Sequence, residues 1–300
     1  MRFSIFQDSH IGSRANNQDR MGYCFTRESL LMIVADGMGG HLRGEVAAQI
    51  TLQTAASSFQ QAARPLIADP AGFLDLSLRR AHREIQKFQQ TNRLPESPRT
   101  TVVACIVQNG HAWWGHAGDS RLYWTRGGSC IGRTEDHSKV QNMANLGLIT
   151  PEEQETHPER NKVLNCLGSP YEPNIEISGA HSLERGDRIM LCSDGVWSGL
   201  PEKQLNEMLF DGPVANAVPR LVLEAVDSLG PGADNATALA MHWDDDSGDE
   251  ISSHLIPDGA VTTTISVGVE EEAEIEDITE DEIEQTIREI RDAIEKTGGG

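Results

Sequence analysis

Short apolar runs separated by polar and glycine-containing segments recur through the first 243 residues. They are rich in valine, isoleucine and aromatic residues, a pattern typical of β-strands. The predicted strands lie at residues 21–26, 30–35, 101–108, 112–117, 121–125, 175–179, 188–193 and 237–243. Segments with asparagine or glycine, at 108–111 and near 127–128, join neighbouring runs. Because these residue types tolerate a positive φ, we expect hairpins and hence antiparallel sheets.

Longer segments rich in alanine, leucine and glutamine predict helices. These segments lie at residues 44–60, 72–90, 202–209 and 214–229. The predicted helices come in pairs that are adjacent in sequence, and the hairpin-connected strands lie between the two pairs. This order predicts an α+β fold in which helices cover antiparallel sheets.

Charge is distributed unevenly along the 300 residues. The net charge is −21, and residues 244–300, with 19 acidic and 3 basic residues, carry −16 of it. We therefore predict a globular domain at residues 1–243 and an acidic tail at residues 244–300. Within the tail, the pattern at residues 251–269 fits either a strand or a flexible linker.

The end of the tail has the pattern of an amphipathic helix. A capping-box-like Thr279–Glu282 precedes isoleucines at positions 283, 287, 290 and 294, which predicts a helix at residues 279–296. A disordered acidic tail is the equally weighted alternative. As a hypothesis, the helix docks a partner protein or a second copy of the chain.

Composition argues against several classes of protein. Hydrophobic residues make up 38% of the chain, and no stretch approaches the roughly 20 apolar residues of a membrane-spanning helix. The N-terminus lacks the apolar core of a signal peptide, so we expect a cytoplasmic protein without membrane contact. The five cysteines include no C-x-x-C pair, which argues against a zinc site or a redox dithiol. The negative charge argues against nucleic-acid binding.

Aspartates mark the ends of the predicted strands. Asp36 and Asp194 each end an apolar run and precede a glycine, and Asp234 and Asp19 each open a run. Asp119 lies in the turn between residues 112–117 and 121–125. In antiparallel sheets, the end of one strand and the start of its neighbour share an edge, so the five carboxylates could converge on one site. A single Asp-Gly pair is more often an ordinary turn, but the combined set fits chance poorly.

Converging carboxylates repel one another unless a cation neutralises them. An all-oxygen ligand set without cysteine or paired histidine suits Mg²⁺ or Mn²⁺ rather than Zn²⁺. The glycine after Asp36 has a physical use in such a site, since a residue without Cβ lets its carbonyl approach a bound metal.

In order along the chain, these motifs resemble the metal-dependent protein phosphatases, the PP2C-like or PPM family, in its bacterial branch. The resemblance covers roughly residues 1–243. The motifs that carry it are Arg14–Asp19, Ala35–His41, Gly44-Glu45, Arg99–Thr101, Gly118–Tyr123, Glu135–Ser138, Ser193–Trp197 and Gly232–Thr237.

The resemblance implies two antiparallel sheets packed between helix pairs and a two-metal hydrolytic site. By similarity, Asp36 bridges two Mg²⁺ or Mn²⁺ ions, Asp194 and Asp234 hold the first ion, and the Gly37 carbonyl touches the second. Asp19 acts through bound water, and Asp119, helped by Asp194, holds a third, weaker ion. A water or hydroxide that bridges the metals attacks phosphorus in line.

Arg14 matches the arginine that grips the substrate phosphate, a role that suits its planar guanidinium. His41 is a candidate general acid for the leaving alkoxide, and His157 is its rival; a purely structural role remains the alternative for each. The sequence departs from many relatives at Gln18, where they carry glutamate. A neutral amide there adds no charge to the metal site.

Other chemistries fit the chain less well. No cysteine begins a C-x₅-R motif, and no lysine follows a glycine as a P-loop requires. A pseudophosphatase that only binds phosphoproteins is the main rival, but it would be favoured by loss of Asp36, Asp194 or Asp234, and all three are present. A two-metal nuclease is disfavoured by the charge. The resemblance thus implies a phosphoserine/phosphothreonine phosphatase whose partners are phosphoproteins and which opposes a Ser/Thr kinase.

Overall fold

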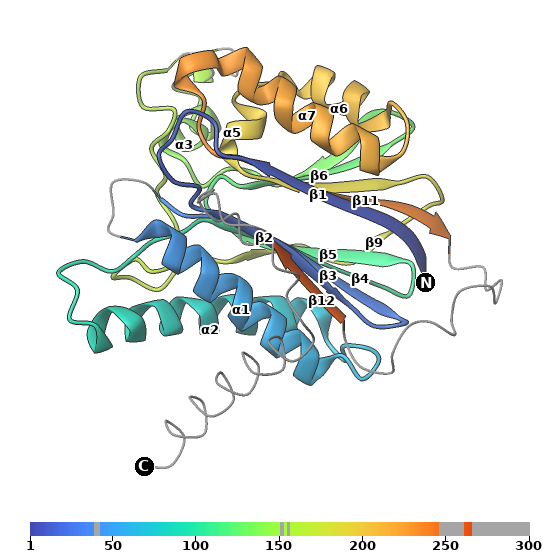
Figure 1. Cartoon of the computed structure of the whole chain (residues 1–300), viewed down its shortest axis with the longest axis horizontal. Coiled ribbons are helices and arrows are strands. Elements are labelled where there is room, and N and C mark those ends of the chain that lie inside the picture. The colour runs from blue at the N-terminus through green and yellow to red at the C-terminus, as the bar shows by residue number, and fades with distance from the viewer. Residues whose placement is uncertain (39–42, 151–152, 155–156, 246–260, 266–300) are drawn as a thin grey trace, which may run out of the picture. The chain divides into compact units, whose positions relative to one another are not determined.

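Two antiparallel sheets organise the chain in the computed structural model, which describes residues 1–38, 43–150, 153–154, 157–245 and 261–265 (Figure 1). Five strands form one sheet in the order β1 (Arg2–His10), β11 (Ala236–Asp245), β10 (Arg188–Cys192), β6 (Arg121–Arg126) and β7 (Ser129–Arg133). The other sheet has the order β12 (Val261–Ile265), β2 (Asp19–Phe25), β3 (Ser29–Asp36), β4 (Val102–Gln108), β5 (His111–Ala117) and β8 (Glu176–Ile177), and β9 (His181–Ser182) also pairs with β5.

Helices cover the outer face of each sheet (Figure 1). Helices α1 (Gly44–Ala62) and α2 (Pro70–Thr91) pack on β2 to β5. Helices α5 (Asp194–Trp197), α6 (Glu202–Phe210) and α7 (Val214–Leu229) pack on the five-stranded sheet. A further helix, α3 (Lys139–Asn145), follows β7. The predicted α+β sandwich of helices around two antiparallel sheets is therefore confirmed.

Three apolar cores hold these layers together. They form because the side chains along each strand alternate between the two faces of its sheet. In β3, Leu31 and Ile33 pack toward α1 and α2, whereas Leu30 and Met32 pack toward the other sheet. Because successive side chains of a strand point to opposite faces, a strand buried on both faces is apolar throughout. The continuous run that ends at Asp36 has this property.

The two predicted hairpins form where expected. Asn109 and Gly110, with φ of 50° and 67°, connect β4 to β5. Gly127 and Gly128, with φ of 57° and 82°, connect β6 to β7. A positive φ at both central positions gives a turn whose twist matches that of the paired strands.

Strand β1 is an element that the apolar pattern did not reveal. Its second half, Gln7–His10, is polar, so periodicity gives little signal there. The strand forms because its whole length pairs with β11, from Arg2 opposite Asp245 to His10 opposite Ala236. Phe3 and Ile5 pack against the core between the sheets. Pairing with a distant strand thus decides a segment that local sequence leaves open.

Part of the acidic segment joins the second sheet. Residues 261–265 form β12, antiparallel to β2, with Val261 opposite Phe25 and Ile265 opposite Met21. The strand alternative for residues 251–269 is thus confirmed over 261–265. The helix predicted at residues 279–296 lies outside the described residues. The domain boundary at residue 243 stays a prediction, and β11 runs to Asp245.

We expect Thr263→Pro to release β12 from the edge of β2. Proline lacks an N–H group and fixes φ at about −65°, away from the value of about −140° of an antiparallel strand, and Thr263 is the central residue of this pairing. Amide hydrogen exchange in β2, measured by mass spectrometry, should then accelerate about 10-fold or more, because an edge strand loses one set of partners. Thr263→Ser is the matched control. Unchanged exchange in β2 would contradict the prediction.

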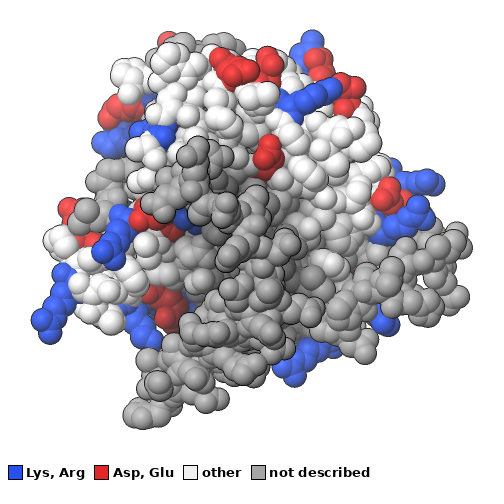
Figure 2. All heavy atoms as spheres, viewed as in Figure 1, with Lys and Arg blue, Asp and Glu red and all other residues white. Residues whose placement is uncertain are grey.

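The described surface shows mixed charge. On the face drawn in Figure 2, acidic and basic side chains lie near one another among neutral residues. Ion pairs also form within helices, between Arg79 and Asp75 in α2 and between Lys203 and Glu207 in α6. None of the helices in the described part of the chain is long and apolar enough to cross a membrane.

Candidate active site

Aspartates from both sheets meet at one end of the sandwich. In the five-stranded sheet, Cys192 of β10 pairs with Arg121 of β6 and with Ala238 of β11. This register places the end of β10 beside the starts of β6 and β11. The aspartates next to these three strand ends are Asp194, Asp119 and Asp234.

Asp36, at the end of β3, lies with these three aspartates on a cavity of about 620 Å³. Arg14 and Gly37 also line this cavity, so six of the residues singled out in the sequence come together there. Asp19 is not among the lining residues. It lies directly opposite Asp36 in the β2–β3 pair and is buried beneath the site.

The Asp19 carboxylate accepts a hydrogen bond from Ser193. The Ser193 hydroxyl donates to its Oδ2 atom over 2.7 Å. The other oxygen, Oδ1, is buried and has no hydrogen-bond partner in the described structure. An unpaired buried carboxylate oxygen is costly, and like charges opposite each other on neighbouring strands repel. A positive charge near the Asp19–Asp36 pair would therefore stabilise it.

Three of the carboxyl groups that line the cavity have raised pKa values. Burial, and then the charges of Asp19 and Asp194, raise the pKa of Asp36 well above its ordinary value. Burial, and then the charges of Asp119 and Asp234, raise the pKa of Asp194 well above its ordinary value. Burial and the charge of Asp136 raise the pKa of Asp119 to about 7. Each ionised group is disfavoured by desolvation and by its neighbours.

This donor set fits hard divalent cations. It consists of carboxylate oxygens, with an unpartnered Asp19 oxygen beneath them, and it lacks thiolate or imidazole among the lining residues. Mg²⁺ and Mn²⁺ prefer such ligands. Binding of these cations would remove the mutual repulsion that raises the carboxyl pKa values. Asp36, Asp194, Asp234 and Asp119 are the residues placed to hold them directly.

The glycines after Asp36 and Asp194 are required by close backbone packing. A Cβ on Gly37 would lie 2.4 Å from the backbone carbon of Gly44, and one on Gly195 would lie 2.2 Å from the backbone oxygen of Asn235. Neither position has a positive φ. The structure thus gives a steric reason for both glycines, in addition to the access of the Gly37 carbonyl expected from the sequence.

Arg14 and Asp234 form a bidentate ion pair at the rim of the cavity. Arg14 Nε lies 2.7 Å from Asp234 Oδ1, and Nη2 lies 2.6 Å from Oδ2. The side chain of Arg14 is 58% exposed, so the guanidinium remains accessible to a ligand in the cavity. The pair joins segments 220 residues apart and links the candidate phosphate-binding residue to a candidate metal ligand.

Asn235 organises the segment that carries Arg14. Its side-chain Nδ2 donates to the carbonyls of Ile11 and Asn16, and its Oδ1 accepts from the backbone N–H of Gln18. Asn235 is buried and lines the cavity. The motif Gly232–Thr237 pointed to this residue, but only the folded chain shows that it shapes the 11–18 loop.

Gln18, the neutral amide where many relatives carry glutamate, lines the cavity and lies beside the carboxylate of Glu45. Gln18 Nε2 donates to Glu45 Oε2 over 3.0 Å, and Glu45 lies in the first turn of α1. The backbone at Asp36 is fixed separately, because the Thr101 N–H and the Thr100 hydroxyl both donate to its carbonyl. These residues hold the site without belonging to the predicted ligand set.

The structure describes only His157 of the two candidate general acids, His41 and His157. His41 lies outside the described residues. His157 is described but does not line the cavity, and its Nδ1 accepts the backbone N–H of Glu159 over 3.1 Å. The geometry therefore brings no support to His157. The assignment of His41 stays a prediction.

The fold and the site together define an α-β-β-α protein with a carboxylate site suited to divalent cations at one end of both sheets. A profile of the family described as Protein phosphatase 2C matches residues 6–225. The chain therefore belongs to the protein phosphatase 2C family.

Named relatives and solved structures agree with this family. The serine/threonine protein phosphatase PstP of Mycobacterium tuberculosis is 34% identical over 228 residues, which are 75% of this chain and 42% of PstP. The serine/threonine phosphatase stp of Listeria monocytogenes is 28% identical over 77% of this chain and 92% of its own length. The crystal structure of the PstP catalytic domain in complex with 2 manganese ions superimposes with a TM-score of 0.67 at 29% identity, over 81% of this chain and 99% of that one. The chain thus spans less than half the length of PstP.

Proposed function

We propose that residues 1–243 hydrolyse phosphoserine and phosphothreonine in proteins, with Mg²⁺ or Mn²⁺ held by the carboxylate site. The observation that carries this proposal is the convergence of Asp36, Asp119, Asp194 and Asp234 on one cavity with Arg14 at its rim. A cation cluster beside an exposed guanidinium can bind a phosphate monoester through several of its oxygens.

The residues divide the work between binding and positioning. Asp36, Asp194 and Asp234 would hold two cations, with the Gly37 carbonyl as a further ligand and Asp19 beneath. Bound cations would supply Lewis-acid polarisation of the phosphoryl group and an acidified water. Arg14 would orient the phosphate for attack, and a proton on His41 would neutralise the leaving alkoxide.

A third cation between Asp119 and Asp194, weaker than the other two, is part of the same proposal. Among the charged neighbours of Asp194, Asp119 raises its pKa most, which supports binding of one cation by both carboxylates. The choice between Mg²⁺ and Mn²⁺ is made by geometry and availability more than by ligand type, because both accept carboxylate oxygen.

Phosphate release from a phosphothreonine peptide, with Mn²⁺, with Mg²⁺ and with EDTA, tests the activity. Turnover that requires a divalent cation and stops in EDTA is the expected result. A folded protein that releases no phosphate with either cation would instead support the phosphoprotein-binding alternative.

We expect Arg14→Lys to raise KM about 10-fold while lowering kcat much less. Lysine keeps the positive charge but loses the paired N–H groups that match two phosphate oxygens. Arg220→Lys, which changes an exposed ion pair between Arg220 of α7 and Asp211 at the end of α6, is the matched control. Steady-state kinetics on the peptide distinguish the two parameters. A variant with unchanged KM would remove Arg14 from phosphate binding.

The wider role follows from the family. We propose that the enzyme acts on phosphoproteins and opposes a Ser/Thr kinase; the names of its relatives, serine/threonine protein phosphatase and serine/threonine phosphatase, support the first part. We also propose that the acidic tail, residues 244–300, docks a partner protein or a second copy of the chain. Unchanged partner binding and oligomeric state after its deletion would oppose this. The cytoplasmic location stays a prediction.

A further inference from the structure

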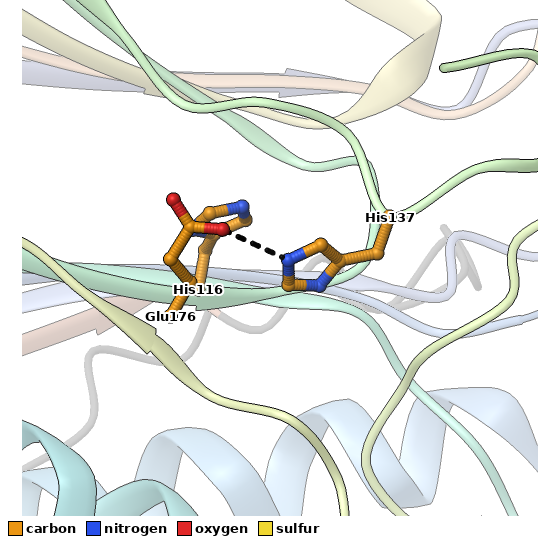
Figure 3. A group of neighbouring side chains, drawn as sticks. All are labelled: His116, His137 and Glu176. Atoms are coloured by element: carbon orange, nitrogen blue, oxygen red, sulfur yellow. Dashed lines mark hydrogen bonds and ion pairs between the residues drawn. The ribbon is translucent and has the colours of Figure 1, made fainter. Parts of the chain in front are cut away.

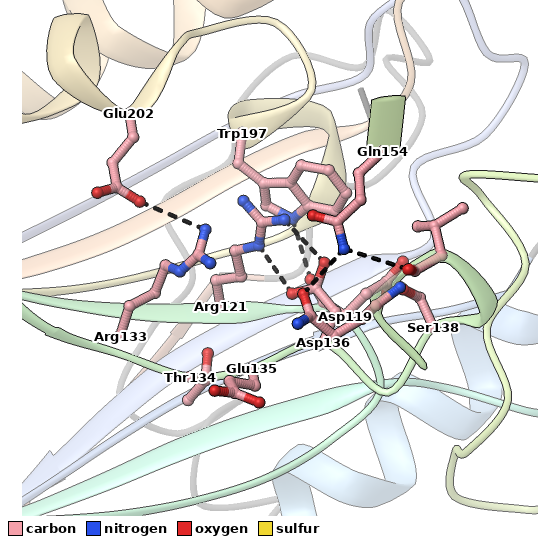
Figure 4. Close-up of polar contacts among 12 residues, drawn as sticks. Asp119, Arg121, Arg133, Thr134, Glu135, Asp136, Ser138, Gln154, Trp197 and Glu202 are labelled. Atoms are coloured by element: carbon pink, nitrogen blue, oxygen red, sulfur yellow. Dashed lines mark hydrogen bonds and ion pairs between the residues drawn. The ribbon is translucent and has the colours of Figure 1, made fainter. Parts of the chain in front are cut away.

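The turn that carries Asp119 is held by side chains outside the proposed ligand set (Figure 4). The guanidinium of Arg121 donates to both oxygens of Asp136, over 2.8 and 2.7 Å. The same guanidinium lies over the Trp197 ring, 3.7 Å from its centroid. Trp197 Nε1 donates to the backbone oxygen of Asp119 over 3.0 Å. We call Arg121, Asp136, His137 and Trp197 the Asp119 clamp.

Trp197 connects Asp119 to Asp194 through one short element. Asp194 is the first residue of α5 and Trp197 is the last. The helical turn that places the Asp194 carboxylate on the cavity therefore also fixes the indole that holds the Asp119 carbonyl. Through this contact, the distance between the two carboxylates depends on Trp197 and on the Arg121 guanidinium packed on its ring.

His137 holds the same turn from its other side. The His137 N–H donates to the Gly118 carbonyl over 2.9 Å, and the Gly118 N–H donates to His137 Nδ1 over 3.3 Å. Gly118 has a φ of 116°, and a Cβ there would lie 2.5 Å from Thr101 Cβ. The turn can therefore relax little, and its position is set by the residues around it.

A group of His116, His137 and Glu176 lies next to this turn (Figure 3). One ligand atom from each lies within 4.8 Å of the others, which is compatible with a metal ion. However, His137 Nδ1 accepts N–H groups from Gly118 and from Asn165. The Asn165 amide is oriented by two hydrogen bonds to the backbone of Asn174.

This pattern decides the tautomer of His137. Because Nδ1 accepts, Nε2 carries the proton of the neutral ring, and it faces Glu176 Oε2 at 3.4 Å. A protonated Nε2 cannot bind a metal ion. His137 thus acts as a hydrogen-bonded anchor between Glu176 and the Asp119 turn.

We propose that the Asp119 clamp is a positioning device, which holds the Asp119 carboxylate beside Asp194 and thereby sets the affinity of the cation site that these two carboxylates form. This inference rests on the proposed function, in which Asp119 and Asp194 hold the third, weakest cation. The clamp residues themselves bind no ligand. They act through the position of Asp119.

Mn²⁺ binding to the full chain, followed by titration calorimetry and by electron paramagnetic resonance of free Mn²⁺, tests the clamp. Trp197→Phe keeps an aromatic ring under Arg121 and removes the N–H that holds the Asp119 carbonyl. We expect it to weaken the weakest Mn²⁺ site about 3- to 10-fold and to leave the tighter sites unchanged. Arg121→Lys, which breaks the bidentate pair with Asp136, should act in the same direction.

Trp124→Phe is the matched control. Trp124 also lies beside an arginine and donates Nε1 to an acceptor at 3.0 Å, but its acceptor is Asp187. It should leave every Mn²⁺ affinity unchanged. Melting temperatures identify any variant that fails to fold.

Asp119→Asn separates failure of the clamp from failure of the cation assignment. If Asp119→Asn abolishes the weakest site but folded Trp197→Phe and Arg121→Lys bind Mn²⁺ like the parent, the clamp is refuted and the proposed cation site stands. If Asp119→Asn leaves all Mn²⁺ sites intact, the assignment of Asp119 fails and the clamp proposal fails with it.

Discussion

Asp36→Asn is expected to lower kcat for phosphate release by about 1000-fold or more. Burial, and then the charges of four neighbouring aspartates, raise the pKa of Asp36, which places it at the centre of the cluster. Asparagine keeps the shape but supplies a neutral oxygen, so a cation that Asp36 would hold would lose the negative charge of this ligand. Each 1.4 kcal/mol of lost transition-state stabilisation costs about a factor of ten in rate, and cation catalysis supplies several kcal/mol.

The stability of the same variant should change in the opposite direction. In EDTA, Asp36→Asn removes one buried ionisable group from a cluster of carboxyl groups that disfavour one another's ionisation, so its melting temperature should rise above that of the parent chain. Asp75→Asn makes the same chemical change on α2, where Asp75 pairs with Arg79, and should leave kcat unchanged. An Asp36→Asn protein that keeps more than about a tenth of the parent kcat would contradict the central role of Asp36.

The second large effect is on the stability of the metal-free protein as pH rises. Asp119 ionises near 3.8 when unfolded and, with its pKa raised, near 7 when folded. Between these values the folded chain binds more protons, so the free energy of unfolding falls as pH increases. Asp36 and Asp194, whose pKa values are also raised well above the ordinary value of 3.8, act in the same direction.

Buried histidines act with the opposite sign in an overlapping range. The pKa values of His82, His116 and His181 are lowered by burial from 6.5, so their contribution to stability rises with pH until about one pH unit above 6.5. The difference in melting temperature between the parent chain and Asp119→Asn, measured from about pH 4 to about pH 7, therefore isolates Asp119, because the histidines contribute equally to both proteins.

In this range and in EDTA, we expect the melting temperature of the parent chain to fall by about 5 °C or more relative to that of Asp119→Asn. Saturating Mn²⁺ should reduce this relative fall, because cations bind the ionised carboxylates of the folded chain. A parent melting temperature that does not fall relative to that of Asp119→Asn would mean that ionised Asp119 is not destabilised in the folded protein.

Local sequence was informative where local structure decides the outcome. The continuous apolar run before Asp36 predicted a strand, and the glycines and asparagine of the two hairpins predicted their turns. The order of aspartates at strand ends predicted a shared site, since antiparallel neighbours bring ends and starts to one edge. Resemblance to a known family then assigned roles that spacing alone could not.

Other features depended on contacts that no local pattern encodes. Periodicity missed β1 because pairing with β11 is what orders its polar half. It also gave no sign that Trp197 reaches the Asp119 carbonyl, or that Asn235 shapes the loop of Arg14.

The sequence by itself thus determined the strands, the main helices and the aspartates that could form a site. Only the tertiary structure decided that Asp19 faces Asp36 across two strands, and that Arg14 pairs with Asp234, 220 residues away. The physical reason is the range of the interactions. Hydrophobic periodicity and turn residues act over a few positions, whereas the register and packing of two sheets fix distances between atoms far apart in the chain.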